Sequence, residues 1–364
     1  MRGLSNRSLV EQAARKALSA QQLEKTLDRV RQLCVTPGEN AAELEEASEI
    51  LRNAGFRQEL MRLLTEALSL PEANPHVGAL WMRRVVTSKV WDHRYPTNLD
   101  SLCEQGEIGH RAVIEFLEVV GGKRRHRLVR QAVARHAKWL RTHPSGWAAA
   151  GRALAQARCY RQAARWMADW RSKPELDLPT LHNLALALRA SGRAREAQEV
   201  IGLALAKPCG GEQFPILKLW QAEDEAFAGN TQKASALFKQ VNAVAWDDDS
   251  LAVFYLVRGV IRVQKAQEAN RTEAFSAARD RLGDIFRRVP IYKRDVFLRR
   301  EYRRCLTRMA RDAGNWPERV RAVWRSAESR TFVLPLLLIP GLQLLLPCYL
   351  YRLTARRKGL AKRR

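Results

Sequence analysis

The sequence has few of the residues that interrupt regular structure, with 20 Gly and 14 Pro among 364 residues. This scarcity excludes a collagen-like or low-complexity chain and does not favour a loop-rich β-sandwich. The six cysteines form no CxxC pair and show no paired spacing, which indicates a reducing compartment and not a disulfide scaffold. No stretch keeps the apolar/polar alternation of a strand, so the chain is expected to be helical.

Local signatures of catalysis are missing as well. The sequence has no G-x-S-x-G, Walker A, H-E-x-x-H or G-x-G-x-x-G motif. The seven histidines do not pair at i and i+4, and none lies beside a cysteine at metal-site spacing. The run Asp247–Ser250 is explained by a loop that caps a helix starting at Leu251. We therefore expect a non-enzymatic protein with no metal and no cofactor.

The formal net charge is +25, and it is carried by 49 Arg and 14 Lys. Because GC-rich codons produce such an Arg and Ala excess, part of the charge is compositional, and a bacterial source is plausible. The charge is uneven, since residues 279–364 hold 23 Lys/Arg and 7 Asp/Glu, a net +16. The N-terminus has no apolar signal-peptide core, so the main body is expected in the cytosol.

Apolar residues recur at helical spacing along most of the chain. The spacing predicts amphipathic helices within residues 5–34, and an α-hairpin whose two helices meet at Asn53-Ala54-Gly55. The pattern is less regular over 77–110 and resumes from Val113 to Leu140. The simplest expectation is an all-α chain of successive hairpins.

The sequence contains an internal repeat with a period of 34 residues. The segment Trp147-x2-Ala150-Gly151-x2-Leu154 returns as Leu181-x2-Leu184-Ala185-x2-Leu188. The same separation relates Ala163 to Ala197, Met167 to Ile201 and Pro174 to Pro208. A period of this length is typical of helical-repeat proteins.

These two segments resemble tetratricopeptide repeats, and a poorer third copy covers about 214–243. The resemblance implies an all-α, tetratricopeptide-like α-solenoid of antiparallel helix hairpins. The residues add a C-terminal membrane-associated apolar segment. The expected organisation is 1–110 as divergent N-terminal hairpins, 111–243 as tetratricopeptide-like repeats (clearest over 145–208), 244–330 as Arg-rich helices, 331–351 as the apolar segment and 352–364 as a basic tail.

Solenoids of this family bind partners in a groove lined by the first helix of each repeat. The resemblance places six residues near that groove: Arg152, Gln156, His182, Asn183, Leu186 and Arg189. Arg152 and Arg189 could pair with carboxylates of a protein partner. The carboxylate clamp of chaperone-binding members is not matched, because Ala148 replaces its first lysine and Leu219 and Glu223 replace its last basic pair.

Residues 331–351 are uncharged and, as a helix, would extend about 30 Å, the thickness of a bilayer core. A re-entrant hairpin turning at Pro340-Gly341, a kinked span and a segment buried in the fold or in a partner all remain open. The residues expected in the membrane are Phe332, Leu334, Leu337, Ile339, Pro340, Gly341, Leu344, Leu346, Tyr349 and Tyr351.

The tail would reinforce this attachment, because basic residues are attracted to anionic lipid. The residues expected to meet lipid headgroups are Arg352, Arg356, Arg357, Lys358, Lys362, Arg363 and Arg364. The expected location is the cytosolic face of a membrane, which in a bacterium is the inner membrane.

The sequence leaves two candidate functions open. The first is a scaffold or adaptor that binds a protein partner through its groove at this membrane. The alternative is a soluble nucleic-acid-binding or regulatory helical-repeat protein with the apolar C-terminal segment buried. The basic helical stretch Lys123–Arg141 favours the alternative, because its Arg and Lys could meet phosphates and Trp139 could stack on a base.

Overall fold

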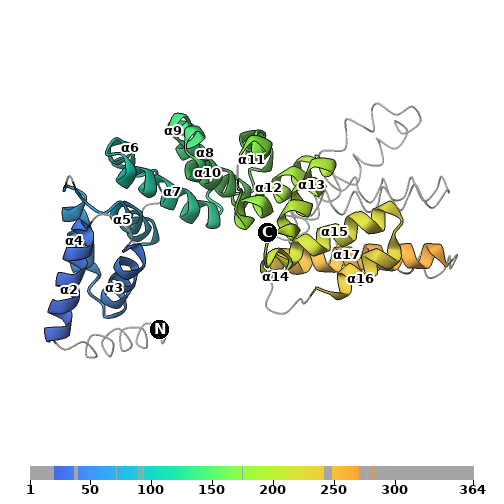
Figure 1. Ribbon diagram of the computed structural model, residues 1–364, viewed down its shortest axis with the longest axis horizontal. Coiled ribbons are helices and arrows are strands. Elements are labelled where there is room, and N and C mark those ends of the chain that lie inside the picture. The colour runs from blue at the N-terminus through green and yellow to red at the C-terminus, as the bar shows by residue number, and fades with distance from the viewer. Residues whose placement is uncertain are drawn as a thin grey trace, which may run out of the picture. The chain divides into compact units, whose positions relative to one another are not determined.

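A computed structural model describes residues 20–36, 40–70, 72–88, 91, 94–173, 175–241, 248–269, 277 and 281. Their regular secondary structure is helical with no strand, which confirms the all-α expectation (Figure 1). The helices are α2 (Ala20–Val35), α3 (Ala41–Asn53), α4 (Arg57–Ala67), α5 (His76–Thr87), α6 (Leu99–Cys103), α7 (Glu107–Gly122), α8 (His126–Arg135), α9 (Ala137–Thr142), α10 (Pro144–Gln156), α11 (Tyr160–Trp166), the 3-10 turn η1 (Trp170–Ser172), α12 (Leu178–Ser191), α13 (Ala194–Ala206), α14 (Gly210–Gln213), α15 (Pro215–Ala228), α16 (Thr231–Lys239) and α17 (Asp248–Glu268).

The chain divides into two compact units, one ending at Gly210 and the other beginning at Gly211. In the first unit, the predicted hairpin of α3 and α4 is confirmed. Gly55 joins its helices with a φ of 89°, a left-handed conformation that glycine adopts without steric cost. Leu44, Leu51, Leu60 and Leu64 are buried between these helices and their neighbours.

The irregular pattern over 77–110 conceals two closely packed helices, α5 and α7. A Cβ on Gly78 of α5 would lie 2.1 Å from the carbonyl oxygen of Ile108 of α7. A Cβ on Gly109 of α7 would lie 1.8 Å from the carbonyl oxygen of Leu102 of α6. Small residues therefore set the packing of α7 on both α5 and α6, which explains why the apolar spacing gave a weak signal there.

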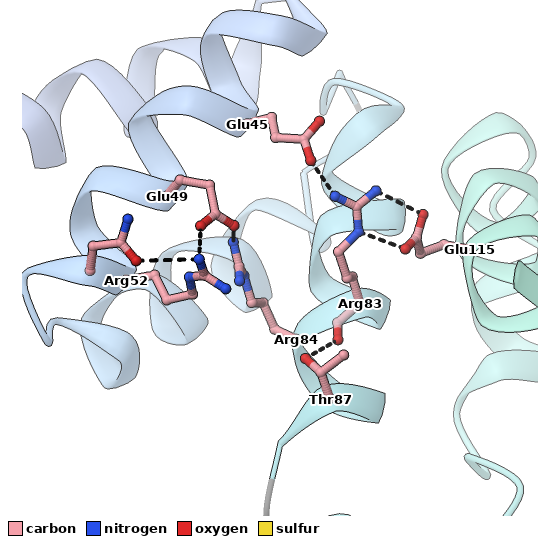
Figure 2. A network of polar contacts seen from close by, with 8 residues as sticks. Glu45, Glu49, Arg52, Arg83, Arg84, Thr87 and Glu115 are labelled. Atoms are coloured by element: carbon pink, nitrogen blue, oxygen red, sulfur yellow. Dashed lines mark hydrogen bonds and ion pairs between the residues drawn. The ribbon is translucent and has the colours of Figure 1, made fainter. Parts of the chain in front are cut away.

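A network of arginines and carboxylates joins α3, α5 and α7 (Figure 2). Arg83 on α5 pairs with Glu45 on α3 and with Glu115 on α7. Arg84 donates to Glu49 of α3 over 2.6 Å, and Glu49 also pairs with Arg52. Polar side chains thus hold the N-terminal helices together alongside the apolar core.

The expected continuous helix over Lys123–Arg141 is instead two helices, α8 and α9, which are separated by the non-helical residue His136. Leu128, Val129, Ala132 and Val133 are buried as the apolar stripe predicts. His136 lies at this break and is 8% exposed, and the apolar spacing continues on both sides of it, so the sequence pattern gave no sign of the interruption.

Each of the two 34-residue segments is a pair of helices, α10 with α11 and α12 with α13. Helix α10 packs on α7 on one side and on α12 on the other. A Cβ on Gly151 would lie 2.4 Å from the sulfur of Met167, and Ala163 and Ala197 are fully buried. Small residues thus lie where the two helices of a pair approach closely.

In the second unit, α15 packs on both α16 and α17. Helix α17 begins at Asp248, three residues before the expected start at Leu251. Asp248 and Asp249 are therefore helical and do not form a capping loop. Trp220 and Leu219 of α15 are fully buried, and Val257 and Val260 of α17 are fully buried as well.

No helix in the part of the chain that the structure describes is long and apolar enough to cross a membrane. The apolar segment 331–351, the basic tail 352–364 and nearly all of 270–330 lie outside the described residues. The residues expected to meet the membrane and its anionic lipids therefore stay predictions.

Candidate functional site

The six residues expected to line a partner groove lie on two helices that pack together, α10 and α12. Gln156 is exposed, and His182 and Leu186 are half-buried. Asn183 and Arg189 are only 6% and 3% exposed, and Asn183 donates to the carbonyl oxygen of Pro179 over 2.9 Å. The solvent-accessible part of the expected groove is therefore formed mainly by Gln156, His182 and Leu186.

Arg152, the remaining groove residue, is engaged within the chain itself. Its Nη2 donates to Oε1 of Glu118 over 2.6 Å, and its Nη1 donates to Oγ1 of Thr180 over 2.9 Å. A third contact joins Nη1 to Oδ2 of Asp177 over 3.2 Å. The guanidinium thus connects α7, α10 and the start of α12, and a partner's carboxylate would have to compete with these acceptors.

A second polar surface surrounds a cavity of about 670 Å³ beside α8. Five arginines line it, and none of the described residues in its lining is a carboxylate. The complete lining is Arg94, Tyr95, Thr97, Arg124, Arg125, His126, Arg127, Leu128, Gln131 and Arg135. Tyr95 and Leu128 are buried, whereas the arginines are exposed. Such a lining attracts and holds anions.

The connection between α7 and α8 presents two of these arginines, Arg124 and Arg125. Arg124 has a φ of 56°, and its N–H donates to the carbonyl oxygen of Gly121 over 2.8 Å. The N–H of Arg125 donates to the carbonyl oxygen of Val120 over 2.9 Å, which closes a tight turn at the end of α7. Helix α8 then starts with no side-chain cap and no acidic residue in its first turn, so its positive end reinforces the arginines.

Tyr95 forms a buried polar cluster beside the cavity. Its hydroxyl donates to Oδ1 of Asp100 over 2.7 Å and lies 2.6 Å from Nε2 of His136. A hydroxyl has one proton and the carboxylate can only accept, so His136 donates its Nε2–H to the Tyr95 oxygen. This assigns the Nε2–H tautomer to His136.

The surroundings of this cluster shift two ionisation equilibria. Burial, reinforced by the hydrogen bond to Asp100, raises the pKa of Tyr95 far above its ordinary value. Burial lowers the pKa of His136 below its ordinary value, although nearby Asp100 opposes the shift. Arg135 pairs with Asp100, and its guanidinium lies 4.6 Å from the Tyr95 ring centre.

A second aromatic cluster lies on α7 and α9. The rings of His110 and Trp139 stack with centroids 4.0 Å apart, and His143 lies 5.2 Å from Trp139. The His110 ring therefore covers one face of the Trp139 ring, which was expected to stack on a nucleic-acid base. Among the described residues, no group of three or more His, Cys, Asp or Glu could hold a metal ion.

The sequence pointed to part of the cavity and missed the rest. The basic stretch Lys123–Arg141 contains Arg124, Arg125, Arg127 and Arg135, so its charge was a usable signal. Arg94 and Tyr95 lie about thirty residues earlier, in a loop that no local pattern connects to α8. Comparison with known proteins does not extend this list, since no family model and no curated protein matches the chain.

Proposed function

We propose that the chain is a non-enzymatic scaffold or adaptor, a tetratricopeptide-like α-solenoid that binds a protein partner at the cytosolic face of a membrane. The observation that carries the proposal is the approach of Gly151 to Met167, where an added Cβ would lie 2.4 Å from the sulfur. The family resemblance requires a small residue at this point, because the two helices of a repeat cross there.

The packing of the first helices supports the same proposal. Helix α10 contacts both α7 and α12, as the first helices of stacked hairpins do. Arg152 links these three elements through Glu118 and Asp177. A rigid, side-by-side arrangement of helices is what a partner-binding face needs, since little conformational entropy is then lost on binding.

The partner-binding face would be centred on Gln156, His182 and Leu186. These residues combine an amide, an imidazole and an apolar side chain on neighbouring helices, and none of them is fully buried. Arg152 would contribute a charge at the edge of this face, where it is 17% exposed. The surface suits a mixed polar and apolar partner segment better than a strongly acidic one.

Site-specific photo-crosslinking in cells tests the partner face. We expect p-benzoylphenylalanine placed at Gln156 or at Leu186 to give the same protein adduct on illumination. The control position is Leu203 on α13, which is 49% exposed and outside the face. The scaffold proposal is wrong if neither position gives an adduct, or if Leu203 gives the same adduct.

Liposome flotation tests the membrane part with the full-length chain. The variant Leu337→Asp/Leu344→Asp places two charges in the apolar segment, and the matched control is Ile50→Asp/Leu203→Asp, at two exposed apolar positions. We expect wild type and control to float in high salt and the segment variant to remain at the bottom. Equal flotation of all three, or of none, would remove the membrane from the proposal.

A further inference from the structure

The cavity beside α8 has more positive charge than its own surroundings neutralise. Among its arginines, Arg135 is paired with Asp100 and lies over Tyr95. In the described part of the chain, Arg125 and Arg127 form no ion pair with an acidic residue. Two arginines that line the same cavity, at the start of a helix that lacks an acidic first turn, therefore have charge available for a ligand.

The size of the cavity limits the class of ligand. Its volume of about 670 Å³ lies within the range of roughly 300–1,000 Å³ in which proteins bind small organic molecules. A single inorganic anion would leave most of this space unfilled. Arg94, Arg127 and Arg135 come from a loop and from both ends of α8, so a ligand that contacts all three must have anionic groups at more than one place.

The aromatic residue in the lining argues against a single-stranded nucleic acid. Bases bind such proteins by stacking on exposed aromatic rings. The Tyr95 ring is 9% exposed, it packs edge-on against Phe116 with centroids 5.6 Å apart, and the Arg135 guanidinium covers it. The Tyr95 ring thus offers no free stacking surface, and the arginines of the lining would contact a ligand by charge and hydrogen bonds.

We propose that this cavity binds a small molecule carrying two or more phosphate groups. Arg125 and Arg127 would contact one phosphate through charge-assisted hydrogen bonds, and Arg94 and Arg135 would meet the other. The ligand is either a soluble oligophosphate or the headgroup of a two-phosphate lipid, which present the same chemistry to the cavity. The site is independent of the partner face on α10 and α12.

Isothermal titration of the full-length protein with tripolyphosphate, at constant ionic strength, tests the proposal. The cavity variant is Arg125→Gln/Arg127→Gln. The matched control, Arg130→Gln/Arg161→Gln, removes the same charge from exposed positions on α8 and α11 outside the lining. We expect saturable binding by wild type, a loss of at least about tenfold in affinity for the cavity variant and less than twofold for the control.

Vesicles separate the two ligand sources. If the cavity variant also loses retention on cardiolipin vesicles, but not on phosphatidylglycerol vesicles of equal charge, the ligand is a lipid headgroup. If only the tripolyphosphate affinity falls, the ligand is soluble. The vesicle comparison is made in the Leu337→Asp/Leu344→Asp background, because an intact apolar segment would hold the cavity variant on both kinds of vesicle and hide the loss.

Three results would overturn the proposal. The first is no saturable binding of tripolyphosphate and no cardiolipin preference. The second is an equal loss for the cavity and control variants, which would show a general charge effect. The third is binding of a single-stranded oligonucleotide that exceeds tripolyphosphate binding and strengthens with length, which would identify a nucleic-acid surface.

Discussion

Arg83 and Glu115 form a double hydrogen bond between α5 and α7, with Nε to Oε1 at 2.6 Å and Nη2 to Oε2 at 3.1 Å. Glu115 is 8% exposed, so most of its carboxylate is removed from water. The third arm of the Arg83 guanidinium reaches Glu45 of α3 (Figure 2). One arginine therefore fixes two helix contacts, and both acids hold its pKa above the ordinary value.

Replacing Glu115 by Gln should lower the free energy of unfolding by about 1–2 kcal/mol, because Arg83 loses a charged acceptor in a mostly buried place. Urea denaturation measures this loss. The control is Glu104→Gln, an exposed turn residue, which should change stability by less than about 0.5 kcal/mol. In a double-mutant cycle with Arg83→Gln, strictly additive effects would contradict a direct interaction between the two side chains.

Three glycine substitutions should differ in effect according to their surroundings. Gly151→Ala should destabilise by about 1–3 kcal/mol, because its Cβ would lie 2.4 Å from the flexible end of Met167. Gly109→Ala should be worse, since its Cβ would meet a backbone oxygen at 1.8 Å. Gly202→Ala has no atom within 4 Å and should stabilise α13 by about 0.5–1 kcal/mol. Thermal unfolding of the three variants measures the order of their stabilities. If Gly151→Ala unfolds at the same temperature as wild type, the close approach of the helices at Gly151 is contradicted.

Asp177 caps α12 by accepting a hydrogen bond from the N–H of Thr180 over 2.8 Å. Asp177→Ala removes this cap and the contact with Arg152, and it should cost about 1–2 kcal/mol. Asp177→Asn keeps a capping oxygen and loses the charge, so it should cost less than half as much, because the exposed ion pair contributes little. Chemical denaturation compares the two variants; equal losses would mean that the ion pair, and not the cap, stabilises this end.

Stability should fall as the pH is lowered through the ordinary histidine range. Burial lowers the pKa of His136 in the folded protein, so below about pH 6.5 the unfolded chain binds a proton that the folded chain resists. His76 and His110 are shifted in the same direction, also chiefly by burial. Unfolding of wild type and His136→Gln at pH 7.5 and pH 5.5 measures the effect.

We expect His136→Gln to be less stable than wild type at pH 7.5, because it disturbs the hydrogen bond with Tyr95, but to lose less further stability on acidification. His126→Gln is the matched control, since His126 is exposed at the start of α8. An identical pH dependence of wild type and His136→Gln would show that another group causes the acid sensitivity.

Local sequence patterns predicted those parts of the fold that depend on neighbours along the chain. The predicted turn at Asn53-Ala54-Gly55 follows from glycine's access to positive φ. The two segments related by the 34-residue period each contain a pair of helices, α10 with α11 and α12 with α13. These features depend on a few consecutive residues or on the spacing of apolar residues along one face of a helix.

The remaining parts depend on residues far apart in the sequence. The contact of α5 with α7 requires Gly78 to face the carbonyl oxygen of Ile108, and the contact of α6 with α7 requires Gly109 to face that of Leu102, which helical periodicity does not register. The Tyr95–His136 hydrogen bond joins residues 41 positions apart, and the cavity combines that loop with α8. Arg152 was expected to be available to a partner, but its acceptors Glu118 and Asp177 lie on other elements and could not be foreseen.

The boundary at Gly210 has a consequence for how unfolding should be observed. Trp147 is 1% exposed in the first unit and Trp220 is fully buried in the second, so each unit has a core of its own. Separate cores can melt in separate steps, and a single midpoint fitted to the whole chain would then average two transitions. Since Gly151, Glu115, Asp177 and His136 all belong to the first unit, their substitution should shift the unfolding of that unit alone. The sequence has 10 Trp, so amide hydrogen exchange at individual residues, and not total fluorescence, separates the two transitions.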